Sequence, residues 1–223
     1  MRRYGGGVLA RGGAACALGI LLAAAPARAH EEDRQFWVVQ AVTARIDPAT
    51  SIAAELSERA RAAAAGEDQL LGRITLTRRL LPGVDLALGV SAATSAGIGE
   101  IRPEQAIILT HGPLSLRSRL EERMIDGVPE TVLRLRERVL LQLPLDDAAR
   151  WTLHASGEAF FQLNRGRPGD VTGFNTLRTQ IGARHALTPA LALTLLYQRQ
   201  QAVRPGRADG VSHMPVVLLA WTF

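Results

Sequence analysis

The chain has 223 residues, with 26 basic and 21 acidic residues and a formal net charge of +5; all 26 basic residues are arginine. Arg2, Arg3, Arg11 and Arg28 precede residue 30, so residues 30–223 keep 22 arginines against 21 acids, a balance that gives no argument for nucleic-acid binding. The single cysteine, Cys16, also lies before residue 30, which excludes disulfides and thiolate chemistry from the rest of the chain.

The first 29 residues have the pattern of a secretory signal peptide. The early arginines are followed by an apolar stretch over 14–25 and then by Ala27-Arg28-Ala29, a small-x-small cleavage pattern. The apolar stretch is shorter than the roughly 20 residues that a spanning helix needs. We expect residues 1–29 to be removed on export and residues 30–223 to form one domain.

Stretches of β-strand character follow throughout. We predict strands near 35–46, 51–61, 71–80, 84–94, 104–110, 114–125, 131–143, 151–163, 173–187, 190–200 and 212–223. Many are about ten residues or longer, the length that a tilted membrane strand needs. Since bacterial barrels have even strand numbers, the odd count suggests one strand missed, merged or added, and we expect ten to twelve.

The predicted connections alternate in length. The short ones are at 81–83, 111–113, 146–147 and 188–189, and the long ones are at 62–69, 95–103, 164–172 and 201–212. Short turns on one side and longer loops on the other are typical of outer-membrane barrels.

Within the strands, apolar and charged residues alternate. In 114–125 and 131–143, leucines occupy one face and six arginines the other. One arginine at the bilayer midplane costs about 2–4 kcal/mol, and a whole domain is stable by about 5–15 kcal/mol. The arginine face must therefore look into a lumen or into water. A soluble sheet shows the same alternation, so this pattern alone leaves barrel and sandwich open.

The C-terminal run favours the barrel. Val217, Leu219, Trp221 and Phe223 share one face of an extended strand that ends in an aromatic residue, which resembles the C-terminal sorting signal of outer-membrane β-barrels. We therefore predict an all-β, transmembrane, antiparallel up-and-down barrel of about 10–12 strands in the cell outer membrane. Its expected partners are outer-membrane lipids and, through the last strand, the barrel-assembly machinery. Glu137 fits badly, because it falls on the predicted lipid face; a β-bulge or a covering partner would explain it.

Several motifs resemble one family. They are Arg117-Ser118-Arg119-Leu120-Glu121-Glu122-Arg123, Leu133-Arg134-Leu135-Arg136, Ser156-Gly157-Glu158-Ala159-Phe160-Phe161, and Phe174-Asn175 before Arg178. Phe36-Trp37, Glu55, Arg59 and Glu104-Gln105 fit the same order. Together they are similar to the outer-membrane barrel family known as domain of unknown function 2490. The resemblance implies a barrel and supplies neither an activity nor catalytic residues.

Strand parity predicts a charged lumen. The expected network is Glu55, Arg59, Arg73, Arg117, Arg119, Glu121, Arg123, Arg134, Arg136, Arg138, Glu158, Arg178 and Arg184, with Arg79 and Asp85 also inward. The first interpretation is a structural Arg/Glu network that fills a narrow envelope barrel. The alternative is an anion-selective channel or an anion-binding lumen, because the arginine fork suits phosphate and carboxylate.

A second alternative is enzymatic. His154, Ser156 and Glu158 lie on one face of one strand, and the His-x-Ser spacing is similar to that of lipid A deacylase barrels. Residues i and i+2 are about 6.5–7 Å apart at the backbone, so a nucleophile and its base could meet. We expect no enzyme activity. His111, His185 and His213 have no metal-ligand spacing, and we expect neither a metal nor a cofactor.

Overall fold

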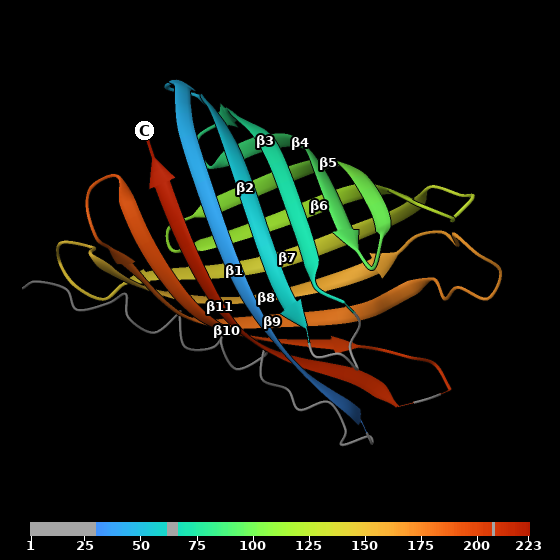
Figure 1. The fold of residues 1–223 in the computed structure, drawn as a ribbon. Helices are drawn as coiled ribbons and strands as arrows, with labels where there is room; N and C mark the ends of the chain where they lie inside the picture. Colours follow the sequence, from blue (N-terminus) through green and yellow to red (C-terminus); the bar gives the residue numbers. More distant parts are fainter. Residues whose placement is uncertain (1–29, 62–66, 207) are drawn as a thin grey trace, which may run out of the picture.

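The structure is a computed structural model that describes residues 30–61, 67–206 and 208–223. The predicted signal peptide lies outside the described residues. Eleven strands account for most of the described chain (Figure 1): β1 His30–Asp47, β2 Thr50–Arg61, β3 Gln69–Leu81, β4 Val84–Ser95, β5 Ile98–His111, β6 Leu114–Ile125, β7 Val132–Pro144, β8 Trp151–Gln162, β9 Gly173–Ala186, β10 Leu191–Ala202 and β11 Asp209–Thr222. Within the described residues no helix is long and apolar enough to cross a membrane.

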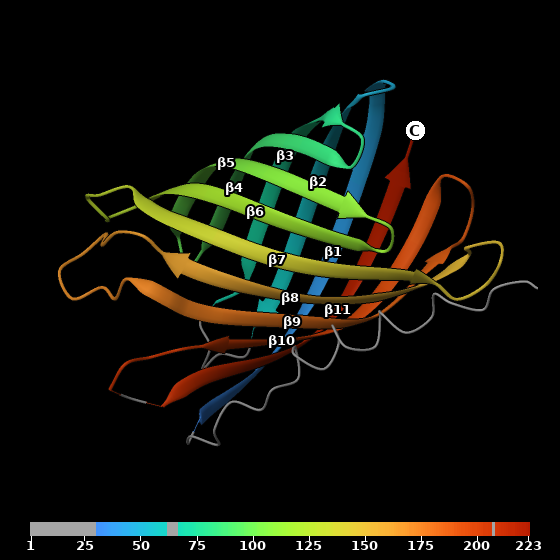
Figure 2. The same cartoon turned by 180° about the vertical axis from the view of Figure 1, so that it is seen from behind.

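The strands close into one barrel in chain order (Figures 1 and 2). Each strand from β1 to β10 pairs with the next in antiparallel fashion, whereas β1 and β11 pair in parallel over twelve residue pairs. This parallel seam is how an odd number of strands closes. The prediction of a barrel of ten to twelve strands is confirmed, and our expectation that the odd count signalled a missing, merged or added strand was wrong.

The register fixes the tilt of the strands. Following paired residues once around the barrel from Arg45 leads back to Glu31, fourteen positions earlier on β1. With a rise of about 3.3 Å per residue and a strand spacing of about 4.8 Å, this stagger gives a tilt of about 41°. The value lies in the usual range for barrels.

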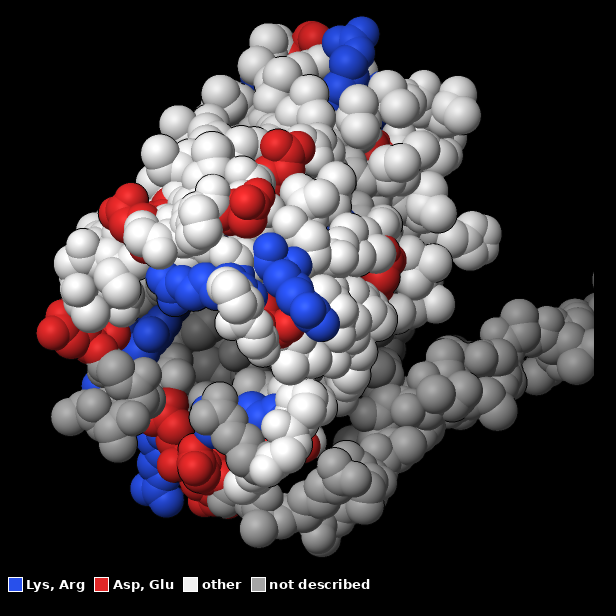
Figure 3. Space-filling model, turned by 90° about the vertical axis from the view of Figure 1, so that its right-hand side faces the viewer, with Lys and Arg blue, Asp and Glu red and all other residues white. Residues whose placement is uncertain are grey.

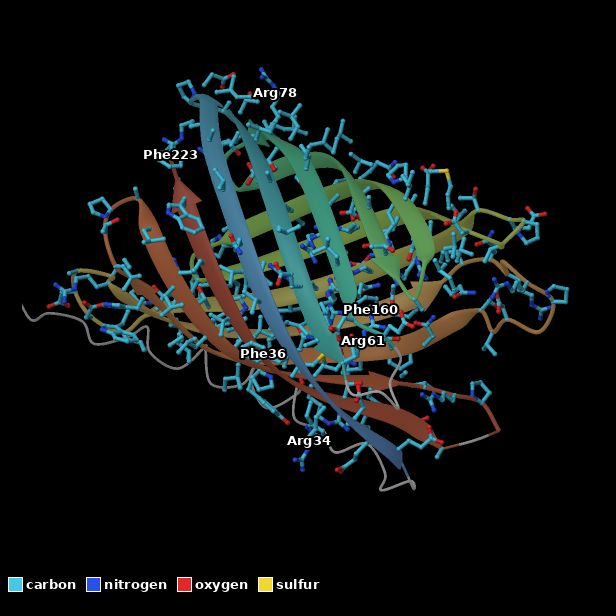
Figure 4. The ribbon with its side chains drawn as sticks, in the orientation of Figure 1. Arg34, Phe36, Arg61, Arg78, Phe160 and Phe223 are labelled. Carbon is cyan, nitrogen blue, oxygen red and sulfur yellow. The ribbon has the colours of Figure 1, made fainter. Side chains whose placement is uncertain are left out.

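The two ends of the barrel differ. We call the end that carries the β1–β2, β3–β4, β5–β6, β7–β8 and β9–β10 connections the turn end, and the opposite end the loop end. Strand β1 starts at the loop end, and β11 finishes at the turn end, next to the labelled Phe223 and on the same side as Arg78 (Figure 4).

One predicted loop is wrong. Residues 95–103 do not form a long connection: β4 and β5 are joined by a tight turn at Ala96 and Gly97, both with positive φ. Strand β5 therefore begins at Ile98 and runs through Pro103, which is paired with Val90 of β4. No β5–β6 register pair includes Pro103. Proline has no N–H to donate to a ladder hydrogen bond, so the pairing with β6 is interrupted at this residue, whereas the pairing with β4 continues.

The outward face is largely apolar. Large side chains exposed on alternate positions include Ile52, Leu56, Ile74, Leu76, Leu88, Val90, Ile107, Leu109, Leu116 and Leu195. Trp151 stacks on His185 near the turn end, and Phe161 contacts Phe174 toward the loop end. The strand parity places Val217, Leu219 and Trp221 on this outward face, and Phe223 is 72% exposed.

Glu137 is the exception that the sequence indicated. Register pairs run without a shift through β6–β7 and β7–β8 at this point, so the bulge that we considered is absent. Glu137 stays on the outward face, where its carboxylate accepts a hydrogen bond from Ser118 Oγ at 2.7 Å. The carboxylate is thus exposed in mid-strand with one polar neighbour.

Candidate functional site: the arginine-lined lumen

The inward face surrounds a cavity of about 410 Å³ that is lined from ten of the eleven strands. Because its lining comes from nearly the whole circumference, the cavity is the lumen itself rather than a crevice within the wall. Figure 3 views the molecule from the loop end, where blue arginine atoms border a hollow. Ten arginines line this cavity: Arg59, Arg73, Arg102, Arg117, Arg119, Arg123, Arg134, Arg136, Arg138 and Arg178.

Glu121 is one centre of the charge network. Its side chain is 0% exposed, and its carboxylate accepts from Arg136 Nη1 at 2.6 Å and from Arg134 Nε at 2.7 Å. Arg119 lies 3.9 Å away. The cross-strand register explains the contacts, since Glu121 on β6 faces Arg134 on β7. A buried carboxylate needs such pairing, because burial without it is costly.

Glu158 is the second centre. It is 4% exposed and receives a two-point contact from Arg136, Nε at 3.1 Å and Nη2 at 2.7 Å. Arg117 Nη2 donates to it at 2.6 Å, and Arg178 Nη1 lies 3.6 Å away. Arg136 thus bridges Glu121 and Glu158, which joins the two centres into one network across β6, β7, β8 and β9.

The network extends through residues that the sequence analysis did not place inside. Glu104 is bound by Arg73 at 3.2 Å, by Arg119 at 2.8 Å and by Ser91 Oγ at 2.8 Å. Arg73 also contacts Glu55 at 3.2 Å, as expected of two predicted luminal residues.

Glu100 forms a smaller cluster near the loop end. Its carboxylate accepts from Arg102 Nη2 and Arg123 Nε, each at 2.5 Å. Glu100 and Arg102 were missed because 95–103 was assigned to a loop, and Glu104, the first residue of the predicted strand 104–110, was not assigned to the inward face. Their alternation with Ile101 and Pro103 was the signal that could have found them.

Two aromatic rings support the guanidinium groups. Arg59 lies over the Trp37 ring at 4.1 Å from its centroid, and Arg136 and Arg178 lie over Phe160 at 4.5 and 4.9 Å. Phe160, labelled in Figure 4, is buried and lines the cavity. Cation–π contacts of this kind hold the planar groups in place without neutralising their charge.

The described lumen carries a surplus of positive charge. Ten arginines line the cavity, and the carboxylates that pair with them belong to five residues, Glu55, Glu100, Glu104, Glu121 and Glu158. Arg59 donates to Gln69 Oε1 at 2.8 Å and has no carboxylate within ion-pair distance among the described residues. No hydrogen bond or ion pair joins Arg138 to any other described residue, and its Nε is buried without a partner.

Toward the turn end the lumen narrows. Small or apolar inward side chains are buried there: Ala87, Ala106, Leu140, Ala192 and Thr194. A second cavity of about 200 Å³ lies at the turn end, and the two cavities share no lining residue. We call the layer of buried side chains between the two cavities the floor of the arginine-lined cavity.

The remaining predicted luminal residues lie near the turn end. Arg184 has the inward parity of Arg178 but does not line the larger cavity. Arg79 and Asp85 form an exposed ion pair at 3.6 Å beside the second cavity.

The three hydrolase candidates all face inward but do not form a triad. Ser156 Oγ donates to Gln180 Oε1 at 2.9 Å, and no hydrogen bond links it to His154 in the described structure. His154 Nε2 is buried without a partner, and Glu158 is occupied by arginines. Among the described residues no group of three or more His, Cys, Asp or Glu side chains is placed to hold a metal ion.

Fold and lumen together define a class, the closed all-β barrel with an arginine-rich interior. Within it, the chain belongs to the family described as "Protein of unknown function (DUF2490)", whose profile matches residues 34–211. The family resemblance seen in the sequence is thereby confirmed. No curated protein matches the chain.

Proposed function

We propose that this protein is an exported outer-membrane barrel whose lumen is an anion-binding pocket, open at the loop end. The proposal rests on one observation: ten arginines face a single cavity in which five glutamates provide the counter-charge. Like charges held close together in a confined, low-dielectric space repel each other, and an entering anion relieves that repulsion.

The size of the cavity supports binding of a small molecule. Ligand pockets usually measure about 300–1,000 Å³, and the lumen cavity measures about 410 Å³. Arginine is the residue best suited to planar, two-point recognition of carboxylate and phosphate groups.

A pocket agrees with the geometry better than a channel does. Buried side chains such as Ala106 and Leu140 separate the two cavities, and an ion path would have to cross this layer. A purely structural network, our first interpretation of the sequence, accounts for Glu121 and Glu158. It leaves the surplus of arginines, and Arg138 above all, without a role.

Support for the membrane location comes from the outer surface and from the sequence. The outward face is largely apolar, and most of the charged side chains within the strands point inward, as in barrels that meet lipid outside. The signal-peptide pattern and the aromatic C-terminal residue agree with the same location.

The test uses residues 30–223 refolded into lipid vesicles, with heat-modifiable gel mobility as the criterion of folding. The unfolding midpoint is measured in sodium phosphate and in sodium chloride at matched ionic strength, and the same sample is recorded in planar bilayers. We expect phosphate to raise the midpoint and the bilayer to show no steady current. Steady anion-selective current steps would show that the lumen is a channel rather than a closed pocket. Equal unfolding midpoints in the two salts, without current, would favour the purely structural Arg/Glu network.

A hydrolase needs a separate measurement. The same vesicles, made with radiolabelled phospholipid or lipid A, are assayed for released fatty acid. We expect none, because Glu158 is bound by arginines and cannot orient His154. Release that disappears in Ser156→Ala, with folding intact, would establish the enzymatic alternative.

A further inference from the structure

Among the arginines that line the cavity, Arg138 and Arg59 have no carboxylate within ion-pair distance in the described structure, and Arg138 is the one that lies opposite another arginine, Arg117. Arg117 and Arg138 are directly opposite each other in the β6–β7 register, and both line the larger cavity. Like charges in directly opposed cross-strand positions destabilise a sheet. The barrel therefore holds two arginine side chains of like charge at directly opposed positions of neighbouring strands, both on the inward face.

The nearest carboxylate cannot neutralise both groups. Glu158 lies opposite Arg138 on β8, but its oxygens are already engaged by Arg117, Arg136 and Arg178. Arg138 forms no hydrogen bond or ion pair with any described residue, and the Nε atoms of Arg117 and Arg138 are both buried without partners. An anion from outside the chain would supply the counter-charge that Glu158 shares among several arginines.

A third nitrogen lies on the neighbouring strand. His154 on β8 lines the same cavity, and its Nε2 is buried without a partner. It is four residues from Glu158 along β8, toward the turn end, and so lies toward the cavity floor. The floor thus gathers two guanidinium groups and an imidazole from three consecutive strands, β6, β7 and β8.

We infer that this cluster, Arg117, Arg138 and His154, is the specific site of the pocket and binds one phosphate group of a small soluble molecule. The inference rests on the proposed function, because it needs an anion to reach the lumen. A phosphate group carries about −1.5 to −2 charges near pH 7 and three acceptor oxygens. A phosphate group therefore matches the surplus of positive charge in the lumen better than a carboxylate group, which carries one negative charge. The remainder of the cavity, toward the loop end, has room for the body of the ligand.

The experiment titrates inorganic phosphate into refolded barrels by calorimetry, at constant ionic strength set with sodium chloride. The variant is Arg138→Gln, which removes the uncompensated charge and keeps a polar, though shorter, side chain. Arg184→Gln is the matched control, an inward arginine that does not line the cavity. Arg138→Lys keeps the charge without the fork.

We expect wild type and Arg184→Gln to bind phosphate alike. The Arg138→Gln variant loses a hydrogen bond to a charged group, so it should bind phosphate about ten- to a hundred-fold more weakly than wild type. The affinity of Arg138→Lys should lie between those of wild type and Arg138→Gln. In the absence of phosphate, Arg138→Gln should unfold at a higher temperature than wild type, because the repulsion from Arg117 is gone.

Two outcomes overturn the inference, and they differ from each other. If Arg138→Gln binds phosphate as tightly as wild type, the pocket stands and the assigned site is wrong. If wild type binds no phosphate, the site and the proposed function both fail. A higher unfolding midpoint of ligand-free Arg138→Gln proves that the variant folds, so that its loss of binding is interpretable.

Discussion

The charge network makes a sharp prediction at Glu158. Glu158→Gln keeps the side-chain volume but removes the negative charge that holds Arg117, Arg136 and Arg178. Glu158 is 4% exposed and the three arginine side chains are 8–16% exposed, so little water is available to compensate for the lost charge. Breaking a buried ion pair by removing one partner costs about 3–5 kcal/mol. Three partners are affected here, so we expect the upper half of that range.

The measurement is urea unfolding of residues 30–223 in lipid vesicles, followed by tryptophan fluorescence. Glu130→Gln is the matched control, an exposed glutamate in the connection between β6 and β7, and should change the free energy of unfolding by less than about 0.5 kcal/mol. Adding Arg117→Gln to Glu158→Gln should restore part of the loss, because it removes one of the uncompensated charges. A loss below about 1 kcal/mol for Glu158→Gln would refute the view that the network is tightly coupled.

Three further predictions concern the wall of the barrel. Gly182→Ala should prevent formation of the heat-modifiable form, because its Cβ would lie 2.0 Å from the Leu195 carbonyl oxygen, whereas Gly72→Ala, with no atom within 4 Å, should fold normally. Glu137→Leu should raise the unfolding midpoint in vesicles, by about 1 kcal/mol in stability, since a carboxylate on the lipid face is unfavourable; an unchanged or lower midpoint would contradict lipid contact there. Deletion of Phe223 should reduce the amount of folded barrel in the outer-membrane fraction of expressing cells without preventing refolding in vitro; equal amounts in cells would contradict its role as a sorting signal.

Strand positions were predictable because the alternation of side chains has a period of two and does not depend on partners. Strand 114–125 was predicted with the bounds that the structure has, and parity alone put Arg134, Arg136 and Arg138 inside. The rule was not applied where residues were assigned to a loop. Residues 98–103 belong to β5, so Glu100 and Arg102 went unnoticed, and Glu104 was not assigned to the inward face although it lay in a predicted strand.

The pairing within the lumen was beyond the sequence. Which carboxylate meets which arginine depends on register, and a shift of one pair of residues would exchange the partners of Glu121. The floor of the cavity was equally hidden. In the sequence, nothing distinguishes Ala87, Ala106 and Leu140 from other inward-facing strand residues. Only the folded barrel shows that their side chains are buried.

The parallel seam has a kinetic consequence. All other neighbouring strands among those described are hairpins, whose partners are close in sequence, whereas the seam joins residues about 180 positions apart, as in Trp37 with Val216. Long-range pairing forms slowly, because the chain must first lose the entropy of a large loop. Until that contact forms, the chain is an open sheet with β1 and β11 as unpaired edges, free to pair with another molecule. Closing the ring is therefore the step at which correct folding competes with aggregation.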